Sequence, residues 1–449
     1  MAIAGAGENP INVINETAMH SRQWVVVVLM VVLNALDGFD VLSSAFAAPG
    51  ISSEWSVERA ALGVVLSAEL VGRGFGSVLL GGAADKFGRK NLMLCCLALM
   101  AAGMFLAGQA TNVTSLVAFR FLTGIGIGGL LAATNAMVAE SSNAKWRRAC
   151  IAAYVSGYPI GAIAGGLVAS EYLLPEFGWR AIFTFGAIAT ALMIPFIMLL
   201  VPETAAYRAS KGDLAGTNRT LAIFGKPQLE GLRAVPTDAS RPKVTDILSN
   251  PRLRPITLLL AFGYMCHTIT FYYIVKFAVQ IVSDYPPGYP PPVAATVLTW
   301  LNVGGFVGSL LFGFVMSWLG VKWPTALVLL LSSFSVVWFG LGHDTIDGWQ
   351  WAAVLAGFAT NAAISGYYAA FARGFPAYAR AGGTGFVLGV GRLGAAGSPL
   401  IAGFLFEKVF GNDALFTVSA IMAAGSVLSA ILLLMLPEHE GDDVVARTD

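Results

Sequence analysis

Apolar and polar residues alternate along the chain in long blocks, not in the short periods of soluble helices and strands. An α-helix needs about 20 mainly apolar residues to cross the hydrocarbon core of a bilayer. Twelve blocks meet that length, so we expect an all-α membrane protein with twelve spanning helices. Their predicted ranges are 24–47, 61–82, 91–110, 115–138, 149–170, 181–201, 256–282, 294–316, 324–341, 350–371, 382–403 and 413–436.

The composition points the same way. The 449 residues are 56% hydrophobic and only 12% charged, whereas a soluble protein carries roughly twice that charged share. The net charge of +1 gives no indication of a nucleic-acid partner. All four cysteines fall in apolar blocks, and we interpret them as reduced core residues.

Positive charges predict the orientation, because cytoplasmic segments of membrane proteins are enriched in lysine and arginine. With the N-terminus inside, 20 of the 27 Lys and Arg residues are cytoplasmic, 3 are outside and 4 lie in predicted helices. We therefore expect both termini in the cytoplasm of a cell, which we take to be bacterial. The one long polar connection divides the chain into an N-terminal six-helix bundle (1–201), a cytoplasmic loop (202–254) and a C-terminal six-helix bundle with a short tail (255–449).

The two halves carry a sequence repeat. A shift of 232 residues places "VGRGFGSVLLGG" (71–82) on "VGGFVGSLLFGF" (303–314). The same shift pairs Gly72 with Gly304, Gly76 with Gly308 and Lys90 with Lys322. Internal repeats of this kind are common in transporters, so we predict two homologous bundles.

Two motifs carry a resemblance to the major facilitator superfamily. "GGAADKFGRK" (81–90) fits the superfamily's G-x-x-x-D-[RK]-x-G-R-[RK] loop at every position, and "RFLTGIGIGG" (120–129) resembles its arginine–glycine motif. The resemblance implies two pseudo-symmetric six-helix bundles that work by alternating access. It also implies gating or conformational roles, with simple topogenic charge as the alternative for the loop. The residues concerned are Gly81, Asp85, Gly88, Arg89, Arg120 and Glu140.

Three further segments resemble one family within it, the aromatic acid:proton symporters. They are "DGFD" (37–40), "GWR" (178–180) and "RAGGTGFVLGVGRLG" (380–394). The resemblance implies import of a hydroxybenzoate-like or protocatechuate-like carboxylate by proton symport across a bacterial inner membrane. The implied partners are a small organic anion, protons and the lipid bilayer, the protein working as a monomer without a cofactor or metal.

Asp37 and Asp40 are the candidate proton-coupling residues. An ionised carboxylate in a bilayer costs several kcal/mol, and residues three apart share one helical face. Two such groups at low dielectric cannot both ionise cheaply, so one is expected to hold a proton. The alternative is that one Asp pairs with an arginine to fix the packing. Phe39 lies between them as a candidate aromatic surface.

Intramembrane cations are candidates for substrate binding. Arg392, at the middle of its helix, is the first choice for a carboxylate, because the guanidinium fork matches two carboxylate oxygens. Arg73 either pairs with Glu69, four residues earlier, or contacts substrate. Arg120 is expected to have a structural or proton-relay role. Lys276 either lines the outer cavity or extends its charge to the surface, and Tyr272 is a candidate ring-stacking residue.

Within the predicted helices, these four cations and three acids leave one positive charge. This balance favours an anionic substrate. A dicarboxylate or a larger lignin-type aromatic acid remains the alternative substrate, and uncoupled or exchange transport the alternative mechanism. We expect no enzyme activity, because the sequence has no metal-ligand spacing, phosphate loop or nucleophile motif. His267 is expected to be a packing residue, with a proton relay or metal ligand as alternatives.

Overall fold

The computed structural model describes residues 9–81, 83–232, 244–376, 379–409 and 414–437, without the side chains of residues 85, 244 and 381. This part of the chain is helical, and twelve of its helices have 19 or more residues. Each coincides with one of the predicted apolar blocks. By length and hydropathy eleven of them qualify to cross a membrane, all except α16.

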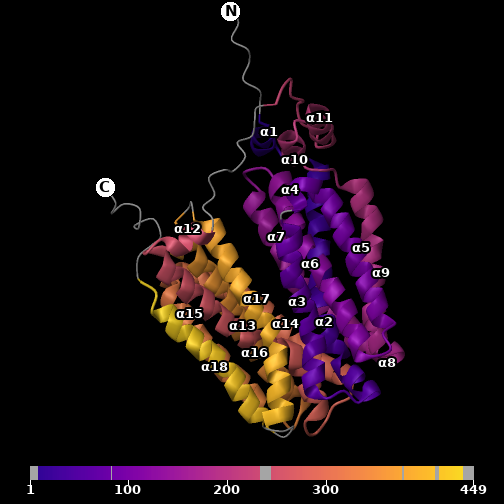
Figure 1. The fold of residues 1–449 in the computed structure, drawn as a ribbon, viewed down its shortest axis with the longest axis vertical. Helices are drawn as coiled ribbons and strands as arrows, with labels where there is room; N and C mark the ends of the chain where they lie inside the picture. Colours follow the sequence, from indigo (N-terminus) through magenta and orange to yellow (C-terminus); the bar gives the residue numbers. More distant parts are fainter. Residues whose placement is uncertain (1–8, 82, 233–243, 377–378, 410–413, 438–449) are drawn as a thin grey trace, which may run out of the picture.

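The long helices of the first half form one bundle (Figure 1). They are α2 (Ser21–Trp55), α3 (Arg59–Gly81), α5 (Arg89–Gly108), α6 (Val113–Ser141), α7 (Arg147–Val168) and α9 (Trp179–Leu200). Between them lie the short α4 (Ala83–Phe87), the π-helical turn η1 (Ala169–Leu173) and α8 (Leu174–Phe177).

The second half forms another bundle. Its long helices are α13 (Leu253–Asp284), α14 (Pro291–Leu319), α15 (Lys322–Gly340), α16 (Ile346–Gly374), α17 (Arg380–Phe404) and α18 (Leu415–Leu434). A π-helical turn, η2 (Leu405–Val409), extends α17.

Four short helices lie at one end of the molecule, which we call the loop end (Figure 1). They are α1 (Pro10–Glu16), α10 (Ala205–Ser210), α11 (Leu214–Ile223) and α12 (Val244–Ser249). A small apolar cluster of Ile14, Ala205, Leu221 and Leu229 holds α1 to α10 and α11. The first part of the central loop is therefore packed onto the first bundle.

The two bundles use the same helix pairing. In the first, α3 packs on α6, α2 on α7, and α5 on α9; in the second, α14 packs on α16, α13 on α17, and α15 on α18. Glycines form the closest of these contacts. An added Cβ would lie 2.2 Å from the Phe121 carbonyl oxygen at Gly72 and 2.1 Å from that of Val354 at Gly304. The residues paired by the 232-residue shift thus make the same backbone contact in each half.

The bundles converge at the end opposite the loop end and diverge toward the loop end (Figure 1). We call the converging end the joined end. Here α2 contacts α13, α3 contacts α17, and α7 contacts α14. The backbone N–H of Ala60 donates to Glu407 at 2.8 Å, and Lys408 lies 3.6 Å from Glu58. The halves are therefore joined by polar contacts as well as by helix packing.

Substitution of a glycine at a contact between two helices should destabilise the bundle. At Gly357 an alanine Cβ would lie 1.8 Å from the carbonyl oxygen of Leu301. Overpacking of this kind costs about 1–3 kcal/mol, so Gly357→Ala should lower the melting temperature in detergent. Gly74→Ala is the matched control, because nothing lies within 4 Å of that Cβ position and alanine is the better helix former. Equal melting temperatures for the two variants would contradict the prediction.

Candidate functional site

The carboxylate of Asp37 on α2 pairs with Arg73 on α3. The Arg73 guanidinium donates to Asp37 at 2.6 Å, and the two side chains are 13% and 2% exposed. The expected alternative in which Arg73 pairs with Glu69 is wrong: Glu69 has other partners, described next. Four residues of separation permit a pair on one helix, but the buried Asp37 on the facing helix takes the guanidinium instead.

One helical turn closer to the joined end, four buried charges form a second group, which we call the buried tetrad. Arg120 on α6 lies at its centre, bonding the Asp40 side chain at 2.8 Å and its carbonyl oxygen at 3.1 Å. The same guanidinium bonds Glu69 on α3. Lys276 on α13 lies 3.6 Å from Glu69 and donates to the Val41 carbonyl oxygen. The tetrad therefore spans both bundles.

The position of Lys276 contradicts one of the two expectations for it. The side chain is 0% exposed, so it does not extend its charge to the surface, and a role in lining the outer cavity stays a prediction. Its ammonium group crosses from the second bundle into the first.

Both groups balance their formal charges. The tetrad has two acids and two bases, and the Asp37–Arg73 pair has one of each. Neutrality is necessary because removing one partner of a buried pair leaves an uncompensated charge. In these two groups, three carboxylate oxygens have no hydrogen-bond partner among the described residues: Asp37 Oδ1, Asp40 Oδ2 and Glu69 Oε1. These are the oxygens on which a proton can be bound without breaking a bond.

Arg392 on α17 differs from the other intramembrane cations. Within the described residues it has no hydrogen-bond or ion-pair partner, and it is partly exposed. It interacts electrostatically with Arg73 and with the phenol groups of Tyr264, Tyr272 and Tyr368. The Tyr264 ring lies against Gly391 and 6.4 Å from the Tyr368 ring. Within the described part of the chain, Arg392 is thus a cation without an ion-pair partner that interacts with three tyrosines.

The tyrosines extend this site to the first bundle. Tyr272 on α13 interacts electrostatically with Arg73 and Asp37, and Tyr158 on α7 does the same. Tyr158 was not predicted as a site residue. Phe39 is 3% exposed, with its ring 5.5 Å from Phe185 on α9. Its contacts are therefore within the first bundle.

The predicted gate loop lies at the loop end. Arg89 donates to Glu140 on α6 at 3.2 and 3.0 Å. Gly88 has φ +93°, a conformation that side chains disfavour, which explains the glycine here. Gly81 ends α3 and Asp85 lies within α4, but the Asp85 side chain is outside the described part, so its pairing stays a prediction.

Glu203, which the sequence analysis did not single out, completes this region. Its carboxylate accepts the backbone N–H groups of Arg89 and Lys90 at 3.0 and 3.2 Å. It thus caps the N-terminus of α5, where a negative charge is favourable. Burial raises the pKa of Glu203, and the backbone donors oppose that rise. The only signal in the sequence was the repeated "VPE" and "LPE".

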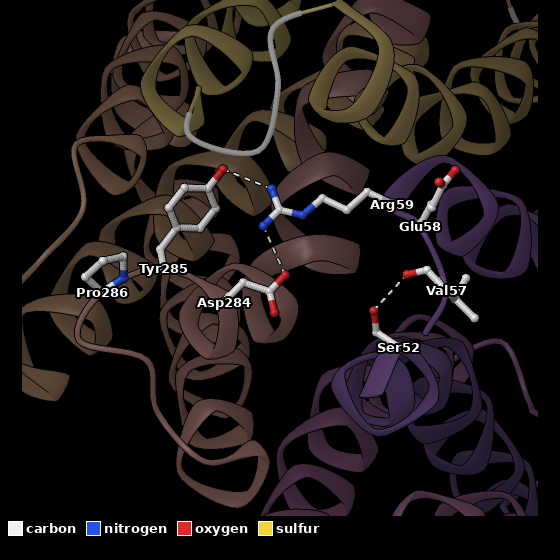
Figure 2. A pocket seen from close by; sticks show the side chains of 7 residues that line it. All are labelled: Ser52, Val57, Glu58, Arg59, Asp284, Tyr285 and Pro286. Atoms are coloured by element: carbon white, nitrogen blue, oxygen red, sulfur yellow. Dashed lines mark hydrogen bonds and ion pairs between the residues drawn. The ribbon is translucent and has the colours of Figure 1, made fainter. Parts of the chain in front are cut away.

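At the joined end, Arg59 bridges the bundles (Figure 2). It donates to Asp284 at 3.0 Å and to the Tyr285 hydroxyl at 2.9 Å. A cavity of about 380 Å³ adjoins it, lined by residues of both halves. Ser52 and Glu58 lie on the first-half side of this cavity, and Pro286 lies on the other (Figure 2). These contacts close the joined end.

His267 lies in the core of the second bundle, in agreement with a packing role. Its ring nitrogens are 2.9 Å from the Ser426 hydroxyl and 3.0 Å from the Thr360 carbonyl oxygen. In the part of the chain that the structure describes, no group of three or more His, Cys, Asp and Glu side chains is placed to hold a metal ion.

Comparisons with known proteins agree with this architecture. A family model described as Major Facilitator Superfamily matches residues 29–297. The chain is 27% identical to the 4-hydroxybenzoate transporter PcaK of Pseudomonas putida, over 93% of this chain and 95% of that protein. It is 28% identical to the gallate transporter of the same organism, over 93% of each. The fold is similar to that of the xylose transporter XylE from E. coli, with a TM-score of 0.71, 13% identity, and coverage of 94% and 99%.

Loss of the central arginine of the tetrad should destabilise the protein strongly. Arg120→Met would leave Asp40 and Glu69 buried with only Lys276 beside them, and breaking a buried pair costs about 3–5 kcal/mol. We expect a large fall in the melting temperature in detergent. Arg208→Met is the control, because that arginine forms an exposed pair with Asp213 outside the long helices, and its loss should leave the melting temperature unchanged. Similar melting temperatures for the two variants would contradict the prediction that the tetrad stabilises the protein.

Proposed function

Because the chain belongs to the Major Facilitator Superfamily, we propose that it imports an aromatic carboxylate by proton symport, through alternating access. The chain is a multi-pass cell-membrane protein and a transporter, not an enzyme. The proposal places all twelve long helices across the membrane, the loop end and both termini in the cytoplasm, and the joined end outside. In this assignment the structure is inward-facing.

One observation carries the substrate proposal: within the described residues Arg392 lacks an ion-pair partner, and it interacts electrostatically with three tyrosines. A carboxylate can accept two parallel hydrogen bonds from the guanidinium. The rings of Tyr264, Tyr272 and Tyr368 offer contact surface to an aromatic ring. The similar proteins named above are transporters of 4-hydroxybenzoate and gallate, which supports the same chemical class for this chain.

The charge balance favours one carboxylate over two. Arg73 interacts electrostatically with Arg392 but is neutralised by Asp37, so among the described residues the site offers one unpaired cation. A dicarboxylate becomes favourable only if Asp37 is protonated and Arg73 is released. Asp37 is therefore our proposed link between proton binding and substrate binding, with Asp40 as the second carboxylate. Proton coupling also explains why two acids lie so deep in the membrane.

Uptake into proteoliposomes tests the substrate proposal. With an inward proton gradient, we expect labelled 4-hydroxybenzoate to accumulate, and a protonophore to abolish the accumulation. Unlabelled gallate and benzoate should compete, and succinate should not. Competition by succinate alone would overturn the aromatic assignment and favour the dicarboxylate alternative.

Arg392→Ala should weaken binding, because a charge-assisted hydrogen bond contributes about 1.5–3 kcal/mol. The corresponding increase in the KM for uptake is on the order of 10- to 150-fold. Arg373→Ala is the matched control, because Arg373 is an exposed arginine near the loop end of α16. An unchanged KM in Arg392→Ala would place the carboxylate elsewhere.

A second variant tests the coupling. Asp37→Asn should lose gradient-driven accumulation while it still exchanges internal for external substrate, because exchange needs no net proton movement. Retained accumulation in Asp37→Asn would remove Asp37 from the coupling mechanism.

A further inference from the structure

Lys276 is the only member of the buried tetrad that belongs to the second bundle. Asp40, Glu69 and Arg120 come from α2, α3 and α6, whereas Lys276 comes from α13. Its two polar contacts, Glu69 and the Val41 carbonyl oxygen, both lie in the first bundle. Any motion that separates the bundles at this level must therefore withdraw the ammonium group from the tetrad.

Withdrawal changes the charge of what remains. Asp40, Glu69 and Arg120 together carry one net negative charge when all are ionised. These are the ionisable groups that interact electrostatically with Lys276 among the described residues. Without Lys276, one proton restores neutrality, and Asp40 Oδ2 and Glu69 Oε1 are oxygens without a hydrogen-bond partner in the described structure. A buried uncompensated charge is costly, so either Lys276 or a proton must be present.

We propose that Lys276 acts as a tethered cation that competes with the transported proton for the Asp40–Glu69 pair. This inference rests on the proposed proton symport and adds a positioning residue to it. When the outer side opens, Lys276 leaves and a proton from outside binds one carboxylate. When the outer side closes, the ammonium group returns and the proton is released. The only bond made and broken in this exchange is the carboxyl O–H bond.

The arrangement also determines the side of the protein toward which the proton is released. Asp37 lies one turn closer to the loop end than Asp40 and interacts electrostatically with both Asp40 and Glu69. Its Oδ1 has no hydrogen-bond partner among the described residues. A proton displaced by Lys276 thus has an acceptor on the cytoplasmic side. Without Lys276, the proton stays on the pair in both conformations and is not delivered.

Transport by Lys276→Met tests this directly. In proteoliposomes, the variant should retain exchange of 4-hydroxybenzoate, while its gradient-driven accumulation falls to the equilibrium level and substrate-dependent proton uptake disappears. Lys322→Met is the matched control, because Lys322 also donates to a backbone carbonyl oxygen, that of Leu436, but within the second bundle. Wild-type accumulation in Lys276→Met would overturn the proposal.

Thermal stability in detergent gives a second readout that needs no substrate. The Lys276→Met protein must hold a proton on the pair to stay neutral, so its folded state binds more protons than its unfolded state. Its stability should therefore fall relative to wild type as the pH rises from mildly acidic to mildly alkaline. Adding Glu69→Gln removes the excess negative charge and should abolish this pH-dependent difference.

The two experiments separate the possible failures. If wild-type protein moves no aromatic acid, the proposed substrate is wrong, while the stability measurements still decide whether Lys276 replaces a proton. If Lys276→Met is destabilised equally at every pH and Glu69→Gln does not compensate, Lys276 only fills space, and the proposal is overturned.

Discussion

The need to neutralise buried charge determines how the centre of this protein is built. An unpaired charge in a membrane interior is expensive, and six of the seven charged side chains in the middle of the long helices satisfy the requirement among themselves. Asp37 takes Arg73, and Asp40, Glu69, Arg120 and Lys276 form the tetrad. Arg392 is the seventh, and it has no ion-pair partner among the described residues. The described centre of the protein therefore combines a charge-balanced set of six side chains with one cation that has no partner there.

The helix packing is repeated in the two bundles, whereas the buried charged residues are distributed unequally between them. The helix pairs of the two bundles match, and glycines at equivalent positions bring the same helices into backbone contact. The charges do not match: five of the seven lie in the first bundle, and the second contributes Lys276 and Arg392. The packing is thus repeated in the two bundles, whereas the charge is not. The first bundle holds all three carboxylates, and the second supplies Arg392, which has no ion-pair partner among the described residues.

The sequence predicted the features that depend on local composition. Twelve apolar blocks coincide with the long helices, and the 232-residue shift identified glycines that make equivalent contacts. The ion-pair partners of the buried charges were harder to predict from the sequence than the helices were. Glu69 and Arg73 have the spacing of a helical pair, but their actual partners, Arg120 and Asp37, lie 51 and 36 residues away in the chain. The partners of Lys276 were missed for the same reason, because the sequence of one helix does not reveal which groups the facing helix offers.

The cap on α5 has a consequence for biosynthesis. The helix begins at Arg89, yet its capping carboxylate belongs to Glu203, 114 residues later in the chain. A ribosome makes the chain from the N-terminus, so the first turn of α5 and the neighbouring loop 81–90 emerge long before their acceptor exists. This region acquires its final hydrogen bonds only after α9 has been made and packed beside α5. The N-terminus of α5 is therefore completed last in the first bundle, by a residue that follows α9.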